Sequence, residues 1–175
     1  MSQAADLLLE CHARIRAFLA TARRIAEAKD APPGEVAEAA RAVHRYFTLA
    51  LPLHVEDEER SVLPRLRGRS AEVDGALATM AAEHQEHQGP LADLVATCAT
   101  LSATPARHGE LSTALLTTVA CLEQKLKAHL GAEEVVVIPG MRRWLSPQED
   151  AAIVAEVRSR RAAPTGAEEV PWRPS

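Results

Sequence analysis

The chain has 175 residues, a formal net charge of −4 and a hydrophobic fraction of 47%. This length suits one domain with a buried core, and the hydrophobic fraction excludes a disordered chain. The modest net charge and the lack of a long basic run argue against nucleic acid as a partner.

The N-terminus and the cysteines bear on the compartment. The first twenty residues have neither a basic start nor an uninterrupted apolar stretch, so we expect no signal peptide and no membrane partner. The three cysteines, Cys11, Cys98 and Cys121, match no zinc-finger spacing and suggest no disulfide framework. We interpret them as buried free thiols of a cytoplasmic protein.

The first two expected helices occupy the first third of the chain. Ala and Leu dominate and aromatic residues make up only 3%, which favours helix. The apolar spacing predicts a first helix from about Ala4 to Ala28, ended by Asp30-Ala-Pro-Pro-Gly34. A second helix is expected from Glu35 to about Leu66, with a kink at Pro52.

Three further helices complete the expected fold. Ser70 caps a third helix, which Ser102-Ala-Thr-Pro105 closes, and a fourth runs from near His108 to Pro139-Gly140. Ser146-Pro-Gln-Glu149 begins a short fifth helix. The predicted fold class is therefore all-α. Its parts are an antiparallel four-helix bundle over residues 1–145, a short C-terminal helix over 146–161 and a disordered tail over 162–175.

Two segments, 54–64 and 129–139, share the pattern His-x-x-x-Glu-Glu-x-x-x-(Leu/Ile)-Pro. Residues four apart lie on one face of a helix, so each histidine points the same way as the glutamate four residues later. An imidazole and a carboxylate on one face form half of a chelate. One such pair is weak support for a metal site, but two matching copies predict two halves of one site.

Three more histidines lie on apolar helical stripes: His12 in the first helix, and His84 and His87 in the third. For any one of them, a core histidine is the simpler interpretation. Together with the two motifs they would surround two buried carboxylates, and burying an unpaired charge is prohibitive. Two divalent cations would remove this cost. His87 is left with three interpretations: a ligand, a residue that supports a ligand, or a pocket residue.

The remaining polar candidates are expected outside the site. His44 and His108 lie about 15 and 31 Å along their helices from the motif histidines. Glu59 and Glu134 follow the motif glutamates by one residue and so point about 100° away. We interpret both glutamates as groups that support the ligands from outside or face solvent, and metal binding is the remaining alternative.

This pattern resembles the hemerythrin-like, HHE cation-binding family over roughly residues 4–145. The resemblance implies a four-helix bundle around a non-haem di-iron centre. Two iron ions (Fe²⁺/Fe³⁺) would be bridged by the carboxylates of Glu58 and Glu133 and by an oxo or hydroxo group, although manganese or zinc suits the same ligands. The predicted metal residues are His12, His54, Glu58, His84, His87, His129 and Glu133.

The resemblance also bears on function. Oxygen-carrying hemerythrins have two third-helix histidines four apart, and an aspartate at a longer gap from the fourth-helix histidine. Here the patterns are His84-x-x-His87 and His129-x-x-x-Glu133. The expected function is binding or sensing of O₂, NO or peroxide at an open iron position, with an unknown redox partner. The alternatives are a di-iron oxidoreductase that consumes peroxide or nitric oxide, and a metal-free interaction module.

Overall fold

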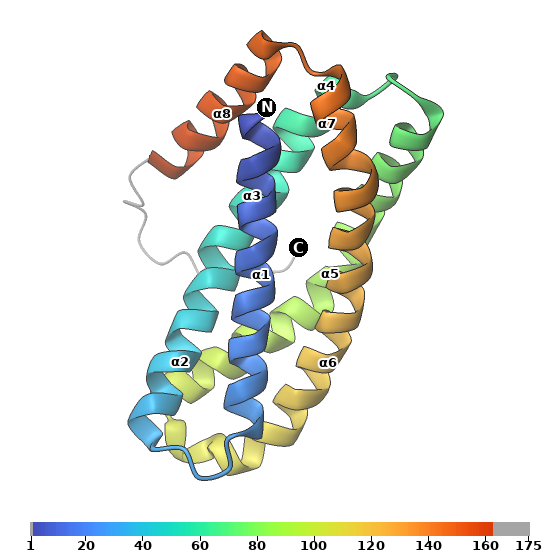
Figure 1. Cartoon of the computed structure of the whole chain (residues 1–175). Helices are drawn as coiled ribbons and strands as arrows, with labels where there is room; N and C mark the ends of the chain where they lie inside the picture. Colours follow the sequence, from blue (N-terminus) through green and yellow to red (C-terminus); the bar gives the residue numbers. More distant parts are fainter. Residues whose placement is uncertain (1, 163–175) are drawn as a thin grey trace.

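The computed structural model describes residues 2–162, and the elements in this range are helical (Figure 1). Four long helical arms run lengthwise, which confirms the all-α bundle. Within residues 2–162, no helix combines the length and apolar character needed to cross a bilayer. The arms are α1 (Gln3–Glu27); α2 (Pro33–Arg45), α3 (Leu51–Asp57) and α4 (Leu63–Leu66); α5 (Ala71–Ala103); and α6 (His108–Ala132) with α7 (Ile138–Trp144).

Local sequence signals set the ends of these helices. The side chain of Ser70 accepts a hydrogen bond from the backbone of Val73, as expected for the cap of α5. Gly68 has a φ of 80°, a left-handed conformation that only glycine adopts without strain, and it turns the chain between α4 and α5. At the start of α6, His108 Nε2 donates to the carbonyl of Ile25 at 2.6 Å, joining this helix to the end of α1.

The second and fourth arms each contain π-helical turns. They are η1 (Tyr46–Ala50), η2 (Glu58–Val62) and η4 (Glu133–Val137), and each stands directly before a Leu-Pro or Ile-Pro pair. Proline has no N–H to donate, and its ring clashes with the carbonyl four residues back. A wider turn relieves that clash while the preceding residue bonds five residues back. The kink expected at Pro52 therefore takes the form of a π turn.

The same rule applies to the two motifs. The N–H of Leu63 bonds to the carbonyl of Glu58, and that of Ile138 to the carbonyl of Glu133. The spacing from glutamate to proline is the same in both motif copies, and it places each motif glutamate at the first position of a π turn. The motif ending is a local structural signal as well as part of a ligand pattern.

The core consists of two apolar clusters with a polar layer between them. The lower cluster, at the bottom of Figure 1, packs the C-terminal part of α1 and α2 against α5 and α6. The upper cluster, at the top of Figure 1, contains residues from α4, from α7 and from the first turns of α1 and α5. Along each arm, the motif histidines and glutamates lie between residues of the two clusters. The thiols are free within the described chain, but only Cys98 is buried; Cys11 and Cys121 are half-buried, so the expectation of buried thiols is wrong for these two.

A further helix, α8 (Pro147–Ala162), packs beside the N-terminal half of α1 and against α3 (Figure 1). Ser146 and Glu149 form the expected capping box: the Ser146 hydroxyl accepts from the Glu149 N–H, and the Glu149 carboxylate accepts from the Ser146 N–H. The apolar side chains of α8 join the upper cluster. Of the expected tail, Ala162 still belongs to α8, and residues 163–175 lie outside the described part of the chain.

Candidate metal centre

Six buried side chains from the four arms converge in the polar layer. The most exposed of them, His84, is only 8% exposed. They form two groups, and within each group the ligand atoms all lie within 4.8 Å of one another. One group is His12, His54, Glu58 and Glu133; the other is Glu58, His84, His129 and Glu133. Both glutamates therefore belong to both groups.

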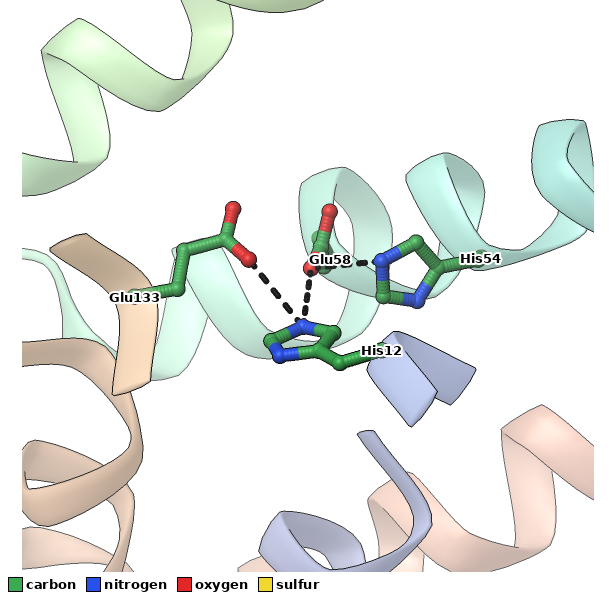
Figure 2. Close-up of side chains that lie close together, drawn as sticks. All are labelled: His12, His54, Glu58 and Glu133. Carbon is green, nitrogen blue, oxygen red and sulfur yellow. Dashed lines mark ion pairs between the residues drawn. The ribbon is translucent and has the colours of Figure 1, made fainter. Parts of the chain in front are cut away.

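The carboxylate of Glu58 turns one oxygen to each group. Its Oε1 lies 3.2 Å from His54 Nε2 and 3.9 Å from His12 Nε2, contacts that Figure 2 shows. Its Oε2 lies 3.3 Å from His84 Nε2. Such an arrangement is the one required of a carboxylate shared by two cations.

Glu133 repeats this arrangement from the opposite arm. Its Oε2 lies 3.1 Å from His12 Nε2, and its Oε1 lies 3.0 Å from His129 Nε2. In Figure 2, Glu133 and Glu58 approach His12 from two different helices. The centre thus consists of two histidine pairs with two carboxylates between them.

The hydrogen bonding of these groups tests whether a metal fits. Several buried atoms that face the centre have no hydrogen-bond partner: His12 Nε2, His84 Nε2, Glu58 Oε2 and both carboxylate oxygens of Glu133. Buried polar atoms without partners are costly, and native proteins contain few of them. Here they point at common positions and are all good donors for a transition metal. The residues present fit bound cations.

Residues 3–120 match the family model described as the hemerythrin HHE cation binding domain. The chain belongs to this family. No curated protein matches the sequence. The matched region of the HHE domain contains His12, His54, Glu58 and His84, whereas His129 and Glu133 lie beyond it. The inclusion of these two residues rests on the repeated motif and on the geometry of the centre.

Three carboxylates support the HHE centre from outside. The Nδ1 atoms of three histidines each donate to a glutamate: His12 to Glu134 at 3.0 Å, His84 to Glu59 at 3.0 Å and His129 to Glu83 at 2.8 Å. A carboxylate on Nδ1 holds the proton there and leaves the Nε2 lone pair free for a metal. Of the interpretations of Glu59 and Glu134, the structure favours support of the ligands.

Glu83 holds a candidate ligand, and the sequence reasoning missed it. It directly precedes His84, and this position turns it toward α6, where it meets His129. The signal was available only as an acidic residue one position from a candidate ligand. His54 differs from the other three histidines, because its Nδ1 has no hydrogen-bond partner among the described residues.

Electrostatics show what a cation must displace. Burial lowers the pKa of His12, but its contacts with Glu133 and Glu58 outweigh burial and raise this pKa to about 10. Burial likewise opposes protonation of His129, yet Glu133 raises its pKa to about 9. Burial lowers the pKa of His54. Protons on His12 and His129 therefore compensate the carboxylates without metal, and a bound cation replaces them.

His87 is the one predicted metal residue that the structure leaves out of both groups. It is buried, and its ring meets the ring of His129 edge-on at 5.1 Å between centroids. It also lines a surface pocket of about 320 Å³ that includes Glu83, Cys121 and Lys125. Burial and the neighbouring His129 lower its pKa to about 4. His44 and His108 lie outside the centre, as expected.

Proposed function

We propose that this HHE domain binds two iron ions per chain and binds or senses a small ligand such as O₂, NO or peroxide. The observation that carries the proposal is the division of each shared carboxylate. Each carboxylate presents one oxygen to the His12–His54 pair and the other to the His84–His129 pair. Glu58 lies between His54 and His84, and Glu133 lies between His12 and His129. A single cation would bind one histidine pair and leave the other pair without a metal to coordinate.

The donor set supports iron and an open position. Each group offers two imidazoles and two carboxylate oxygens. Mixed imidazole and carboxylate donors suit iron, manganese and zinc, and the family resemblance implies iron. When bound, an iron ion with fewer protein donors than coordination sites supplies a position at which a diatomic molecule or peroxide can bind. In this proposal His87 is a pocket residue beside His129 rather than a ligand.

The chain's own residues hold and shield this centre. The apolar clusters above and below it exclude bulk water, and the outer glutamates fix the imidazole orientations. Tyr46, the single tyrosine, stacks on Phe18 at 4.1 Å between ring centroids, and its hydroxyl donates to the carbonyl of Cys11. It therefore packs rather than delivering a proton to the centre, which favours binding over turnover.

The test is metal content followed by ligand binding. Protein loaded anaerobically with ferrous iron, then desalted, is expected to retain two irons per chain by elemental analysis. After oxidation, azide should produce a new charge-transfer band. His44→Ala is the matched control, because this half-buried histidine lies away from the centre. Retention of at most one iron by the fully loaded protein contradicts the two-ion proposal.

Peroxide separates binding from catalysis. A protein that binds or senses is expected to react with at most stoichiometric hydrogen peroxide. Loss of peroxide over many turnovers, faster per bound iron than with a Glu58→Ala protein, would instead identify an oxidoreductase. Nitric oxide consumption is measured in the same way with its own electrode.

A further inference from the structure

The two copies of the motif differ on the face that points away from the centre. In the first copy this face carries an acid, a hydroxyl and a base at spacings of four. The second copy has two small residues and a valine in the same places, and it carries no charge there. The matched positions are Asp57, Ser61 and Arg65 in the first copy, and Ala132, Val136 and Gly140 in the second.

Asp57 is almost fully buried, at 1% exposure, although sequence places it within the acidic run Glu56-Asp-Glu-Glu59. Two arginines of α8 compensate its charge. Arg160 Nη1 donates to Oδ1 at 2.6 Å, and Arg161 Nη2 lies 2.6 Å from Oδ2. A buried carboxylate depends on such partners, because removing them leaves an uncompensated charge in the protein interior.

The contact continues along the same face. Arg160 Nη2 donates to the buried hydroxyl of Ser61 at 2.7 Å, and that hydroxyl donates to Glu156 at 2.6 Å. Glu156 in turn accepts from Arg65 at 2.6 Å. These bonds hold both ends of the π turn η2, which begins at Glu58. We call Glu156, Arg160 and Arg161 the α8 clamp.

The α8 clamp also reaches α1. Arg161 Nη2 lies 3.9 Å from the sulfur of Cys11, the residue before His12. The neighbours of α8 include α1, α3 and η2, which carry His12, His54 and Glu58. The other histidine pair lies on α5 and α6; Glu83 of α5 supports His129, and Glu59 of η2 supports His84.

We infer that Asp57 is a positioning residue, through which the α8 clamp fixes the His12–His54 half of the centre more firmly than the His84–His129 half. The inference rests on the proposed two-ion function. Without the arginines, the Asp57 carboxylate is drawn toward solvent, and this rotates η2 and its neighbours. Three of the four donors of one group then lose their alignment. The other group loses the alignment of Glu58 and of Glu59, which supports His84, but it keeps His84, His129 and Glu133 on elements to which the clamp makes no hydrogen bond or ion pair among the described residues.

The first test is a split in metal affinity. Ferrous iron is added anaerobically to wild type, to Arg160→Ala/Arg161→Ala, and to Arg158→Ala, which removes an exposed arginine of the same helix. Wild type and Arg158→Ala are expected to bind two irons with unchanged affinities. The double variant should keep one iron and bind the second about tenfold more weakly, as when other supports of ligands are removed. Equal binding of both irons by the double variant overturns the inference.

Two further variants identify the cause. Asp57→Asn keeps the shape of the side chain but removes the ion pairs that tie this position to Arg160 and Arg161. The release of η2 from α8 should then give the same split even if the double alanine variant folds poorly. Arg160→Lys/Arg161→Lys keeps Asp57 compensated and is expected to retain both irons. A lysine pair as damaging as the alanine pair would refute charge compensation as the role of the clamp.

The second test needs no metal. Amide hydrogen exchange is compared in chelator-stripped wild type and double variant over residues 54–62 and 129–137. The clamp predicts faster exchange in the first segment only, whereas a general loss of stability speeds both together. Equal acceleration of both overturns the inference. If wild type binds no iron, the proposed function fails, and the exchange pattern still decides whether the clamp holds η2.

Discussion

The two copies of the motif are alike toward the centre and unlike away from it. His54–Glu58 and His129–Glu133 place their donor atoms at 3.2 and 3.0 Å within each copy, and each glutamate begins a π turn. The outward faces have different neighbours. Asp57 of the first copy is buried under α8, whereas Ala132, its counterpart, is exposed.

The supports of the two histidines differ in the same way. His129 donates its Nδ1 proton to Glu83 of the adjacent helix, and His54 has no such partner within the described residues. One copy is thus held by a carboxylate on its imidazole, and the other by ion pairs behind its backbone. Helical spacing places a ligand, while the surrounding elements decide how firmly it stays there.

The largest expected effect is the same for both copies of the motif. Glu58→Gln and Glu133→Gln should each reduce the iron content from two ions to less than one per chain, because each carboxylate belongs to both groups. Elemental analysis of loaded and desalted protein measures this. Loss of only one ion in either variant would show that its carboxylate is not shared.

Removal of metal should lower stability without unfolding the bundle. The apolar clusters are independent of metal, so chelator-stripped protein is expected to stay helical by circular dichroism. A ligand present at about 100 times its Kd stabilises the native state by about 2.7 kcal/mol. For a chain of this size, that corresponds to a Tm difference of roughly 5 to 10 °C. Glu58→Gln serves as control and should show no difference between stripped and iron-treated samples.

Substitutions that exchange matched residues between the two copies should have different effects on the free energy of unfolding. Asp57→Ala leaves two arginines without their buried partner and is expected to cost about 3 kcal/mol of unfolding free energy. Ala132→Asp adds the same acid to an exposed position and should change stability by less than about 0.5 kcal/mol. Urea unfolding of the metal-free proteins measures both. Equal costs would contradict the difference between the two outward faces.

The smallest effect concerns the Nδ1 supports. Glu83→Gln weakens the hold on His129 and should reduce iron affinity at the His84–His129 position by about tenfold, with little change at the other position. Glu86→Gln is the matched control, since this nearby glutamate is largely exposed and pairs with Lys125 instead. Competition with a coloured chelator gives the two affinities. An equal effect of the two variants would exclude support through His129.

Much of the fold and centre follows from local patterns in the sequence. Apolar periodicity, helix caps and Pro or Gly breaks together predicted five helices, and Ser70 and Ser146 cap the helices that they were expected to begin. Six of the seven predicted metal residues converge, because a spacing of four keeps His54 and Glu58 on one helix face. His87 follows His84 by three residues instead. That spacing still keeps the two on one helix face, but His87 lies about one turn further along α5, where it lines the pocket between α5 and α6 instead of joining either group.

Which residues share a helix face follows from the sequence alone, because that depends only on the geometry of a helical turn. The sequence also carried the prolines that open the π turns at Glu58 and Glu133. Only the tertiary structure decided the surroundings of each ligand. Asp57 reads as part of a solvated acidic run, yet it is buried by arginines about a hundred residues later in the chain. Such partners are set by how separate helices pack, and packing between distant segments leaves no mark in local spacing.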